Sequence, residues 1–497
     1  MKLKDILSFL DKKIVKGNSE IEIMSITQNS RKISSGGLFA AIEGQNTDGN
    51  KYIKEAIERG AHAVVTEKEY TDNNDDSVCQ IIVPDVRKAL GEIASRFYGS
   101  PSEKINLIAI TGTNGKTTTS YILESIFRAA NKKTGIIGTI YYKIGEEKTY
   151  STHTTPVAEE FQLLLSKMVE NNVDICVAEI SSHAIAQKRI WGSKFNTAIF
   201  TNLTHDHLDY HKTIEEYGNT KLELFTSYLK SNGTGIVNLD DPWADKFIKS
   251  GAKNIMTYGF SRGSNVMAFN VAPRLDGTSM SILTPEGIIE CYVKLIGLYN
   301  VHNIMAAVCG ALAMGLDIDT INEGLDELEP IKGRFEYVEG GQTFSVVVDY
   351  AHTPDGLQKV LETIRSLFRG RLIVVFGATG DRDKSKRPIM GKIVSLFSDI
   401  MIITSDDPHS ENPEMIADEI ISGVPKEKIQ CIIKETDRKK AIEKALDMAT
   451  PQDFILIAGK GHETKQIFKD KIIDFNDKEL ALKYLLKKYC NSDTRAL

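Results

Sequence analysis

Residues 105–130 constrain the fold more than any other stretch, because an apolar run, a glycine-containing turn and a helix-length segment follow one another there. They read INLIAITGTNGKTTTSYILESIFRAA, with Gly112 and Gly115 inside the turn. The apolar runs KTGIIGTI, VDICVAEI and TAIFTNL follow, with helical stretches among them. This alternation predicts βαβ units around a parallel sheet. From residue 255 to residue 296 the strands follow one another without helices, which predicts a small antiparallel addition.

The chain has 497 residues, too many for one hydrophobic core, and its patterning divides it into three units. Residues 1–98 mix short strands with helices and end before GSPSEK, whose Gly, Ser and Pro residues cannot continue a helix. Residues 99–332 form the second unit. In residues 333–497, five short apolar runs alternate with helix-length segments. The pattern predicts an α/β protein of three domains, of which the last is doubly wound and Rossmann-like.

Four polar clusters follow apolar runs of the third unit: DYAHTPDG, GATGDRDKSKRP, SDDPHSENP and GKGHE. Ligands in doubly wound sheets bind beyond the carboxyl ends of the strands. We therefore expect the four clusters to meet at one rim of the sheet and to form a binding site there.

The turn TGTNGKTTT, residues 111–119, has the residue types of a phosphate-binding loop. Its glycines would let backbone amides approach phosphate oxygens, Lys116 would neutralise the phosphates, and the Thr117 hydroxyl would bind Mg²⁺. Only two residues separate Gly112 from Gly115, fewer than in the usual pattern. A plain strand-to-helix connection is the alternative, but the added Lys and Thr favour nucleotide binding.

Glu179 lies near the end of the apolar run VDICVAEI. It is a candidate ligand for Mg²⁺, which prefers carboxylate and phosphate oxygens. Ser181, His183 and Arg189 surround the turn that follows it. From the residues alone, a binding role and a role as helix-capping and surface residues are equally open.

The segment TNLTHDHLDYH, residues 201–211, contains His205, His207 and His211. A zinc site, a structural loop and a nucleotide-metal role for one histidine are the alternatives. The segment contains no Cys and no HExxH motif, which argues against zinc. Because the segment ends the strand TAIF of the phosphate-loop unit, we favour the nucleotide-metal role. Lys221, in NTKLELF, is expected from the residues alone to be a solvated helix lysine.

Bulk composition excludes several classes of protein. A net charge of −6 argues against a generic polyanion binder, so we expect no nucleic-acid partner. The six cysteines are scattered without a CxxC pair, as in a cytosolic protein with reduced thiols. No apolar run approaches the ~20 residues of a membrane span. We expect a cytoplasmic protein that binds small molecules.

Together these motifs resemble the Mur ligase family, the ATP-dependent amide-forming ligases of bacterial peptidoglycan synthesis, and most closely its MurE branch. The resemblance runs through the whole chain, in NSRKISSGGLFAAIEGQNTDG, TGTNGKTTT, HTTP, EISSHAIAQKR, TNLTHDHLDYH, NVHNIMAA, GRFE, DYAHTPD, GDRDKSKRP, DDP and GKGHE. It implies an N-terminal α/β uridine-nucleotide-binding domain, a central ATPase domain and a C-terminal domain that binds an amino acid. It also implies addition of a diamino acid, the third stem-peptide residue, to the D-Glu γ-carboxylate of UDP-N-acetylmuramoyl-L-Ala-D-Glu.

Motif by motif, the resemblance implies roles for individual residues. The implied ATP site consists of Gly112, Thr113, Asn114, Gly115, Lys116, Thr117, Thr118, Asn303, Arg334 and Asp349. The implied UDP-muramoyl-dipeptide site consists of Ser30 and Arg31 at the UDP end and of Thr154, Thr155, Ser181 and Arg189. The implied amino-acid site consists of Arg382, Asp406, Asp407, His409, Gly459 and Glu463. Two Mg²⁺ ions are implied, with Thr117, Glu179, His207 and a carbamylated Lys221 as ligands, and Lys116, Glu179, His207 and Lys221 as the catalytic residues.

The implied mechanism is a transfer in two steps. The D-Glu γ-carboxylate attacks the γ-phosphate of the co-substrate ATP, which gives an acyl phosphate and ADP, and the amine of the incoming amino acid then displaces phosphate. Acyl phosphates hydrolyse in water, and the implied ATP contacts come from two domains. We therefore expect the domains to close over the site.

The loop Asp406-Asp407-Pro408-His409 bears on which amino acid is added. In family members that add meso-diaminopimelate this loop reads D-N-P-R, and the Arg binds the distal carboxylate. Histidine is mostly neutral at pH 7, with an ordinary pKa of about 6.5, so it is a poor substitute for a guanidinium. The extra carboxylate of Asp407 would favour an ammonium group. We therefore expect L-lysine first and ornithine second.

Other interpretations of this loop and of the whole chain stay open. His409 could merely cap the following helix, or Lys384 or Lys386 could bind the distal carboxylate of meso-diaminopimelate. A non-catalytic or repurposed Mur-like binding protein, or a ligase for another γ-glutamyl acceptor, would fit the same fold. The retained phosphate-loop and metal-binding residues argue against a non-catalytic protein.

Overall fold

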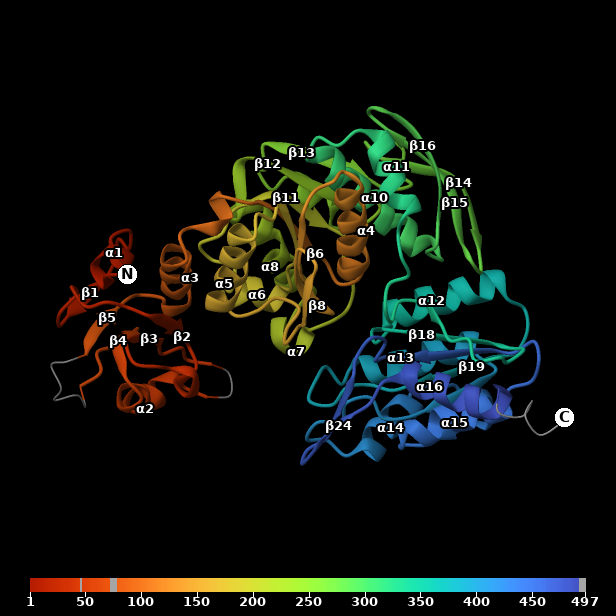
Figure 1. The fold of residues 1–497 in the computed structure, drawn as a ribbon. Helices are drawn as coiled ribbons and strands as arrows, with labels where there is room; N and C mark the ends of the chain where they lie inside the picture. Colours follow the sequence, from red (N-terminus) through yellow and green to blue (C-terminus); the bar gives the residue numbers. More distant parts are fainter. Residues whose placement is uncertain (45–46, 72–77, 491–497) are drawn as a thin grey trace.

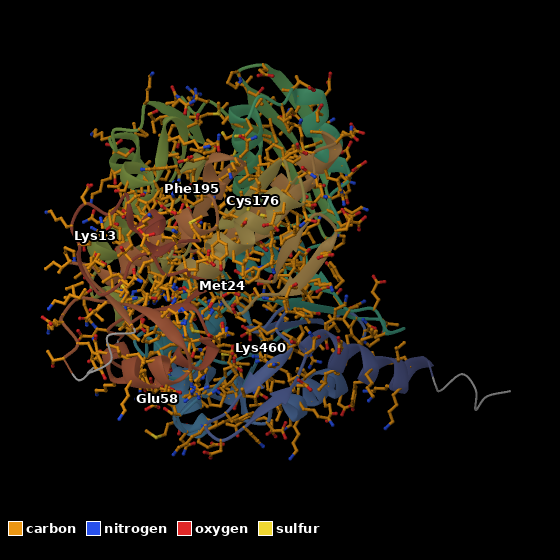
Figure 2. The ribbon with its side chains drawn as sticks, turned by 60° about the vertical axis from the view of Figure 1, so that its left-hand side comes forward. Lys13, Met24, Glu58, Cys176, Phe195 and Lys460 are labelled. Carbon is orange, nitrogen blue, oxygen red and sulfur yellow. The ribbon has the colours of Figure 1, made fainter. Side chains whose placement is uncertain are left out.

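A computed structural model describes residues 1–44, 47–71 and 78–490 of the chain. Three α/β domains follow one another, and the central domain lies between the other two (Figure 1). Side chains such as Cys176 and Phe195 are packed inside the central domain, and Lys460 is packed inside the C-terminal domain (Figure 2). No helix in the ranges that the structure describes is long and apolar enough to cross a membrane.

The N-terminal domain has a five-stranded sheet in the order β1-β5-β4-β3-β2. Its strands are β1 (Ile14–Lys16), β2 (Ser25–Thr27), β3 (Gly37–Ala40), β4 (Ala61–Thr66) and β5 (Cys79–Ile82). Its helices are α1 (Leu3–Leu7), the short 3₁₀ turn Ser30–Lys32, α2 (Ile53–Glu58) and α3 (Val86–Phe97). Asp85 caps α3, because its carboxylate accepts a hydrogen bond from the backbone N–H of Lys88.

The central domain has an eight-stranded sheet in the order β13-β12-β11-β6-β10-β7-β8-β9. The strands are β6 (Asn106–Thr111), β7 (Thr134–Ile137), β8 (Tyr141–Ile144), β9 (Glu147–Tyr150), β10 (Ile175–Glu179), β11 (Phe195–Phe200), β12 (Leu229–Asn238) and β13 (Asn254–Tyr258). The helices are α4 (Lys116–Ala129), α5 (Ala158–Glu170), α6 (Ser182–Ala186), α7 (Leu208–His211), α8 (Ile214–Ser227), α9 (Ala244–Ile248), α10 (Leu298–Ala313) and α11 (Ile318–Asp326). From β13 to β7 the strands are parallel, as the βαβ pattern predicts.

Helices cover both faces of this sheet because the side chains of each strand alternate between the faces. On β6, Ile108 and Ile110 pack in the core that includes α4 and α10, whereas Leu107 and Ala109 pack in the core that includes α5 and α8. The carboxyl ends of the parallel strands consequently meet at one edge, where the phosphate loop lies.

The antiparallel addition is a three-stranded sheet of β14 (Met267–Arg274), β15 (Gly277–Thr284) and β16 (Gly287–Val293). The prediction was wrong for its first strand. The run near residue 255 forms β13, which pairs in parallel with β12 at the edge of the main sheet. The pattern could not reveal this, because the pairing partner of a short apolar run depends on the tertiary fold.

The C-terminal domain has a six-stranded sheet in the order β17-β18-β22-β19-β20-β21, and all of it but β17 is parallel. The strands are β17 (Glu336–Tyr337), β18 (Ser345–Asp349), β19 (Leu372–Phe376), β20 (Ile400–Ile403), β21 (Ile432–Lys434) and β22 (Phe454–Ala458), with a separate hairpin of β23 (Lys465–Ile467) and β24 (Ile472–Asp474). The helices are α12 (Pro354–Leu367), α13 (Lys386–Phe397), α14 (Pro413–Ile421), α15 (Arg438–Met448) and α16 (Asp477–Leu485). The five predicted apolar runs are the five parallel strands.

A fully buried ion pair joins α15 to α16 in this domain. Arg438 and Asp477 are 0% exposed at their side chains and lie 2.6 Å apart, and the guanidinium also donates to the backbone oxygens of Ser405 and Ala458. Burial alone would lower the pKa of Arg438, but Asp477 and other nearby carboxylates raise it, so the buried guanidinium keeps its charge.

We expect Asp477→Ala to lower the free energy of unfolding of the C-terminal domain by about 3–5 kcal/mol, because it leaves a buried guanidinium without its counter-charge. Glu443→Ala is the matched control, since Glu443 contacts Lys439 on the surface of the same α15 at 3.9 Å. The control should cost at most about 0.5 kcal/mol. Urea unfolding followed by circular dichroism measures both, and equal losses for the two variants would contradict the expected role of the buried pair.

Candidate active site

The phosphate-binding loop joins β6 to α4 and is closely packed against its neighbours. Gly112 has a φ of +150°, and a Cβ atom there would lie 1.9 Å from the hydroxyl oxygen of Thr201. Gly115 has a φ of +91°, and a Cβ atom there would lie 2.3 Å from the side-chain oxygen of Asn303. Only glycine fits at either position. The backbone N–H groups of Thr113 and Asn114 donate to the backbone and side-chain oxygens of Asn202, at 2.8 and 3.0 Å.

Two lysine side chains meet at this loop. Lys116 donates hydrogen bonds to the backbone oxygens of Gly112 at 2.8 Å and Thr113 at 2.9 Å. Lys221, on α8, donates to the same Gly112 oxygen at 3.0 Å, and its Nζ lies 4.3 Å from the centre of the Tyr217 ring. Lys221 is only 1% exposed, so its interpretation as a solvated helix lysine was wrong.

Burial changes the chemistry of both amines. It lowers the pKa of the Lys221 amine well below the ordinary 10.5, and the nearby Lys116 lowers it further. It also lowers the pKa of Lys116, while Glu179 opposes the shift. A lysine with a lowered pKa carries a neutral, nucleophilic amine at physiological pH for part of the time.

Glu179, at the end of β10, is 0% exposed and lies beside the loop. Its carboxylate accepts hydrogen bonds from the Thr117 hydroxyl at 2.8 Å, from the backbone N–H of Thr139 at 3.0 Å and from the Thr139 hydroxyl at 2.9 Å. The structure thus brings the predicted magnesium ligands Thr117 and Glu179 into direct contact.

The C-terminal domain completes this arrangement. Arg334 donates to the Thr117 hydroxyl at 3.1 Å, and its guanidinium lies 4.7 Å from the centre of the Tyr350 ring. Asp349 is buried and accepts from the backbone N–H groups of Phe335 and Ala351, both at 2.7 Å. Burial raises the pKa of Asp349, and Arg334 opposes the shift.

A cavity of about 360 Å³ lies beside the loop, between the central and C-terminal domains. Asn114, Gly115, Thr118 and Asn303 line it from the central domain, and its C-terminal lining includes Arg334, Asp349, Tyr350 and Lys359. A cavity of this size suits the base and sugar of a nucleotide. It also contains most of the residues predicted to bind ATP.

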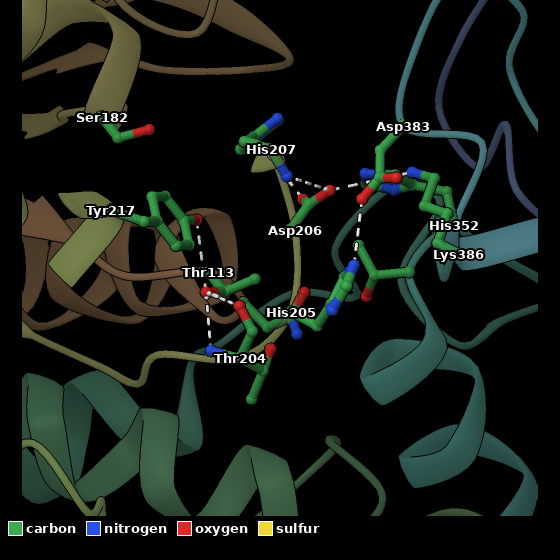
Figure 3. A network of polar contacts seen from close by, with 12 residues as sticks. Thr113, Ser182, Thr204, His205, Asp206, His207, Tyr217, His352, Asp383 and Lys386 are labelled. Carbon is green, nitrogen blue, oxygen red and sulfur yellow. Dashed lines mark hydrogen bonds and ion pairs between the residues drawn. The ribbon is translucent and has the colours of Figure 1, made fainter. Parts of the chain in front are cut away.

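The loop 204–211 forms a polar network between the two domains (Figure 3). His207 adopts a left-handed conformation with a φ of +55°, and its Nε2 lies 3.4 Å from the Asp206 carboxylate. Asp206 also faces Lys386 of the C-terminal domain at 3.8 Å. Burial alone would raise the pKa of Asp206, but His207 and Lys386 hold it below its usual range.

The three histidines of this loop point to different partners. The Nε2 atom of His205 lies 3.0 Å from Asp383 of the C-terminal domain, and that of His211 lies 2.9 Å from the Ser182 hydroxyl. Among the described residues, no set of side chains with metal-binding geometry includes these histidines, so the structure gives no support to the zinc alternative. His207 is the one of the three that lies next to Lys221, Lys116 and Asp206.

The residues predicted to bind the muramoyl dipeptide lie together next to Glu179. The Thr155 hydroxyl donates to the backbone oxygen of Glu179 at 2.7 Å and accepts from the backbone N–H of Ser181 at 3.0 Å. Arg189 donates to the backbone oxygen of Thr155 at 2.9 Å, and Thr154 lies 3.1 Å from the Thr139 hydroxyl. Ser181 also caps α6, so the capping interpretation of this residue is confirmed.

Ser30 and Arg31 lie in the N-terminal domain, in the 3₁₀ turn Ser30–Lys32. The Ser30 hydroxyl donates to Glu55 at 3.0 Å, whereas Arg31 is exposed. The structure therefore separates these two residues from the phosphate loop by the whole junction between the N-terminal and central domains (Figure 1).

The predicted rim of the C-terminal sheet contains a compact charged cluster. Asp406, Asp407 and Glu463 surround the ammonium group of Lys460, at 3.9, 2.8 and 2.6 Å. Burial raises the pKa of Glu463 to about 7, although Lys460 opposes the shift. Gly459 has a φ of +115°, and a Cβ atom there would lie 2.7 Å from the Asp406 carboxylate.

These contacts correct the expectation for Asp407. Its carboxylate is 2.8 Å from Lys460 and also accepts from the backbone N–H of Ile467 at 2.9 Å. A carboxylate that is already paired with a buried lysine does not by itself favour an ammonium group of a substrate.

His409 is half-buried in a left-handed conformation with a φ of +50°, and its backbone N–H donates to Ile467. It does not cap the following helix, because Asn412 is the capping residue of α14. Lys384 is paired with Glu411 at 2.9 Å and Lys386 faces Asp206, so both alternative lysines are already engaged. Arg382 is exposed.

Two polar residues that the sequence had not singled out belong to this site. Lys460 lies within the GKGHE cluster and is 1% exposed, and a lysine in the middle of a rim cluster was the available signal. Asp355, within DYAHTPDG, accepts a hydrogen bond from the side chain of Asn114 at 2.7 Å across the domain boundary. No signal in the sequence indicates that second contact, because it exists only when the two domains meet.

Taken as a whole, the site combines a glycine-containing loop at a helix N-terminus, the contacting oxygens of Thr117 and Glu179, and a charged cluster on the facing domain. Side chains from two domains reach the same loop, so a nucleotide and a second substrate can be enclosed between them. This arrangement suits phosphoryl transfer to an acceptor that is held away from water.

Comparisons with known proteins agree with this geometry. Three family models match the chain: "Mur ligase family, catalytic domain" over residues 22–98, "Mur ligase middle domain" over 110–311, and "Mur ligase, glutamate ligase domain" over 333–461. A protein of Syntrophomonas wolfei, named UDP-N-acetylmuramoyl-L-alanyl-D-glutamate--2,6-diaminopimelate ligase, is 40% identical over 98% of this chain and 99% of its own length. A protein of the same name from Clostridium tetani is 42% identical over 97% and 98%.

Solved structures give the same result. A structure of a ligase with that name superposes with a TM-score of 0.68 at 29% identity, and covers 98% of this chain and 99% of its own. The MurF ligase of Thermotoga maritima in complex with ADP superposes with a TM-score of 0.63 at 20% identity, over 96% and 99% of the two chains, which shows a shared fold.

The histidines of the site give a testable consequence. Burial lowers the pKa values of His183 and His211 to about 4, so we expect neither imidazole to take up a proton between pH 5 and pH 8. In the unfolded chain the ordinary value is about 6.5. The unfolded state therefore binds more protons between pH 6.5 and pH 4, and stability should fall as pH decreases through that window.

Proton NMR of the imidazole C–H signals measures this directly, with His183→Gln and His211→Gln used for assignment. The same signals in urea-unfolded protein provide the control and should titrate near pH 6.5. A midpoint above pH 6 for either residue in the folded protein would contradict the expectation.

Proposed function

The chain belongs to the Mur ligase family, and on this premise we propose that it joins 2,6-diaminopimelate to the D-Glu γ-carboxylate of UDP-N-acetylmuramoyl-L-Ala-D-Glu. The reaction is an ATP-dependent amide ligation in peptidoglycan synthesis. The observation that carries the proposal is similarity at 40–42% identity, over nearly the whole length of both chains, to proteins named for this reaction. These names favour diaminopimelate over the lysine that the loop around His409 had suggested.

The ATP phosphates would lie over the loop between Gly112 and Thr117, where backbone amides and the α4 N-terminus favour negative charge. Lys116 would leave the loop carbonyls that it now contacts and donate to the phosphoryl oxygens. Arg334 would add a second positive charge from the C-terminal domain, so that transfer requires both domains in contact.

Thr117, Glu179, His207 and a carbamylated Lys221 would hold Mg²⁺. The fit rests on the contact between Thr117 and the buried Glu179, since hydroxyl and carboxylate oxygens are the donors that Mg²⁺ prefers. The ion would offset negative charge on the phosphoryl oxygens during transfer.

Lys221 can gain an oxygen ligand by reaction with CO₂. Its neutral amine would form a bond to the carbon of CO₂ and lose a proton, which leaves an anionic carbamate. The lowered pKa provides that neutral amine, and the nearby Lys116 would stabilise the resulting negative charge.

The substrate carboxylate would lie near Thr155, Ser181 and Arg189, directly beside Glu179. It attacks the γ-phosphorus atom, ADP leaves, and the acyl phosphate forms at the domain interface. The amine of diaminopimelate then attacks the acyl carbon, and phosphate leaves. The interface around Arg334 and His205 would exclude water during the lifetime of the acyl phosphate.

Diaminopimelate would bind at the rim of the C-terminal sheet, with Arg382, Asp406, Gly459 and Glu463 around its reacting end. An ionised Glu463 accepts a stronger, charge-assisted hydrogen bond from an ammonium group than a protonated Glu463 does. The imidazole of His409 would contact the distal carboxylate.

We also propose that the domain borders follow residues 98 and 332. We propose a cytoplasmic location as well, because ATP and nucleotide-linked precursors are made in the cytoplasm.

We expect phosphate release from ATP and UDP-N-acetylmuramoyl-L-Ala-D-Glu to require meso-diaminopimelate, with kcat/KM at least about tenfold lower for L-lysine and L-ornithine. Each analogue lacks the distal carboxylate and leaves its binding group unpaired. Parallel assays with the three amino acids measure this. Preferential turnover of lysine would restore the first expectation for His409, and no turnover with any of them would contradict the ligase proposal.

We expect Lys221→Ala to reduce turnover about 10²–10³-fold, because the carbamate oxygens that would hold Mg²⁺ are lost. Lys253→Ala, which changes an exposed lysine of the same domain, should have no effect. In addition, ¹³C NMR with labelled bicarbonate should show a carbamate signal in the unchanged protein and none in the Lys221 variant. Full activity of that variant would contradict the assignment.

A further inference from the structure

The junction between the N-terminal and central domains brings two guanidinium groups together. Arg87 lies in the first turn of α3, and Arg189 follows α6. Both line a narrow cleft, together with Gln28, Ile42, Leu90 and Val157. Neither the mechanism nor the family motifs use Arg87.

Close packing of two glycines holds these elements against one another. A Cβ atom on Gly91 would lie 2.6 Å from the backbone oxygen of Trp191, and one on Gly192 would lie 2.6 Å from the backbone oxygen of Gly91. The Trp191 indole also donates to Glu92 at 2.8 Å. Because only glycine fits at these two contacts, α3 packs directly against the backbone of residues 191–192, which places the two arginines near each other.

Both guanidiniums contact only neutral acceptors in the described ranges. Arg87 donates to the backbone oxygen of Glu43 at 2.9 Å. Arg189 donates to the backbone oxygen of Thr155 at 2.9 Å and to the side-chain oxygen of Gln187 at 2.8 and 3.1 Å. Burial lowers the pKa of Arg189, and the neighbouring Arg87 adds to this shift, whereas Tyr210 and Glu159 oppose it.

The nearby acidic groups are occupied elsewhere. Glu159 lies at the same junction, but its two oxygens accept from the backbone N–H and the side-chain amide of Gln28, at 3.0 and 3.2 Å. Burial raises the pKa of Glu159, which favours its uncharged form. Asp85 is used as the cap of α3. Among the described residues, no carboxylate forms an ion pair with Arg87 or Arg189, so both guanidiniums can pair with an anionic ligand.

The two arginines also connect two predicted binding regions. Arg87 reaches Glu43, in the segment of the N-terminal domain expected to bind uridine, whereas Arg189 reaches Thr155 beside Glu179. In a UDP-linked sugar the diphosphate lies between the uridine and the sugar. Of the residues expected at the UDP end, Ser30 is bonded to Glu55 and Arg31 is exposed, and neither lines the cleft between the two arginines.

We propose that Arg87 binds the diphosphate of the UDP-linked substrate at the domain junction, where the nearby positive charge of Arg189 adds attraction without direct contact. This inference rests on the proposed function for the identity of the substrate. The planar guanidinium of Arg87 suits bidentate binding of a phosphate, which a lysine ammonium cannot reproduce.

The test is binding of UDP and of uridine, measured by isothermal titration calorimetry on the full-length protein without ATP. We expect Arg87→Ala to weaken UDP binding about ten- to hundredfold and to leave uridine binding within twofold. Arg87→Lys should give an intermediate loss. Arg96→Ala, an exposed position in the last turn of the same α3 and ~14 Å away along the helix, is the matched control and should bind UDP normally.

In steady-state assays the Arg87 variants should show a raised KM for the UDP-linked substrate, with the KM for ATP and kcat within about threefold of the unchanged protein. UDP binding within twofold of normal in both Arg87 variants would overturn the proposal. Equal losses for UDP and uridine would also overturn it, because they would reveal a purely structural role. The calorimetry needs no turnover, so an inactive protein whose UDP binding depends on Arg87 would contradict the ligase proposal alone.

Discussion

The arrangement of the site depends on the hydrogen bonds that the buried carboxylate of Glu179 accepts. A fully buried carboxylate is tolerated only when hydrogen bonds replace its lost hydration, and Glu179 obtains them from Thr117 and Thr139. These bonds join β10 to the start of α4 and to the turn after β7. Arg334 reaches the same Thr117 hydroxyl from another domain. One buried negative charge thus aligns the phosphate loop, the acceptor side and the C-terminal domain.

Much of this fold follows from local pattern. The phosphate loop and the five parallel strands of the last domain appear in the sequence as apolar runs and glycines, because these features are set by neighbours in the chain. The four polar clusters were expected at one rim for the same reason. The place of β13 in the main sheet was missed, since strand partners are chosen by tertiary packing rather than by the strand itself.

The chemistry of the site was harder to foresee than its location. Lys221 looks like any helix lysine until the burial of α8 is known, and only the family resemblance suggested that it could be a metal ligand. Asp407 looked free to bind a substrate ammonium, yet Lys460 satisfies it. In both cases the decisive quantity is the charge and burial of groups distant in sequence, which no short motif encodes. Contacts between domains, such as that of Asn114 with Asp355, could not be predicted from the sequence for the same reason.

The left-handed backbone at His409 has an evolutionary consequence. Two backbone contacts fix this conformation: the hydrogen bond from the His409 N–H to the Ile467 oxygen, and the β-bridge between His409 and Phe468. The imidazole takes no part in either. Asn, Asp, His and Gly tolerate such a conformation most readily, while a β-branched residue would be strained there. The loop backbone therefore fixes the direction in which any side chain at position 409 leaves the main chain. A single base change turns a histidine codon into an arginine codon, so the charge offered to an incoming substrate could be exchanged in one mutational step without rebuilding the loop.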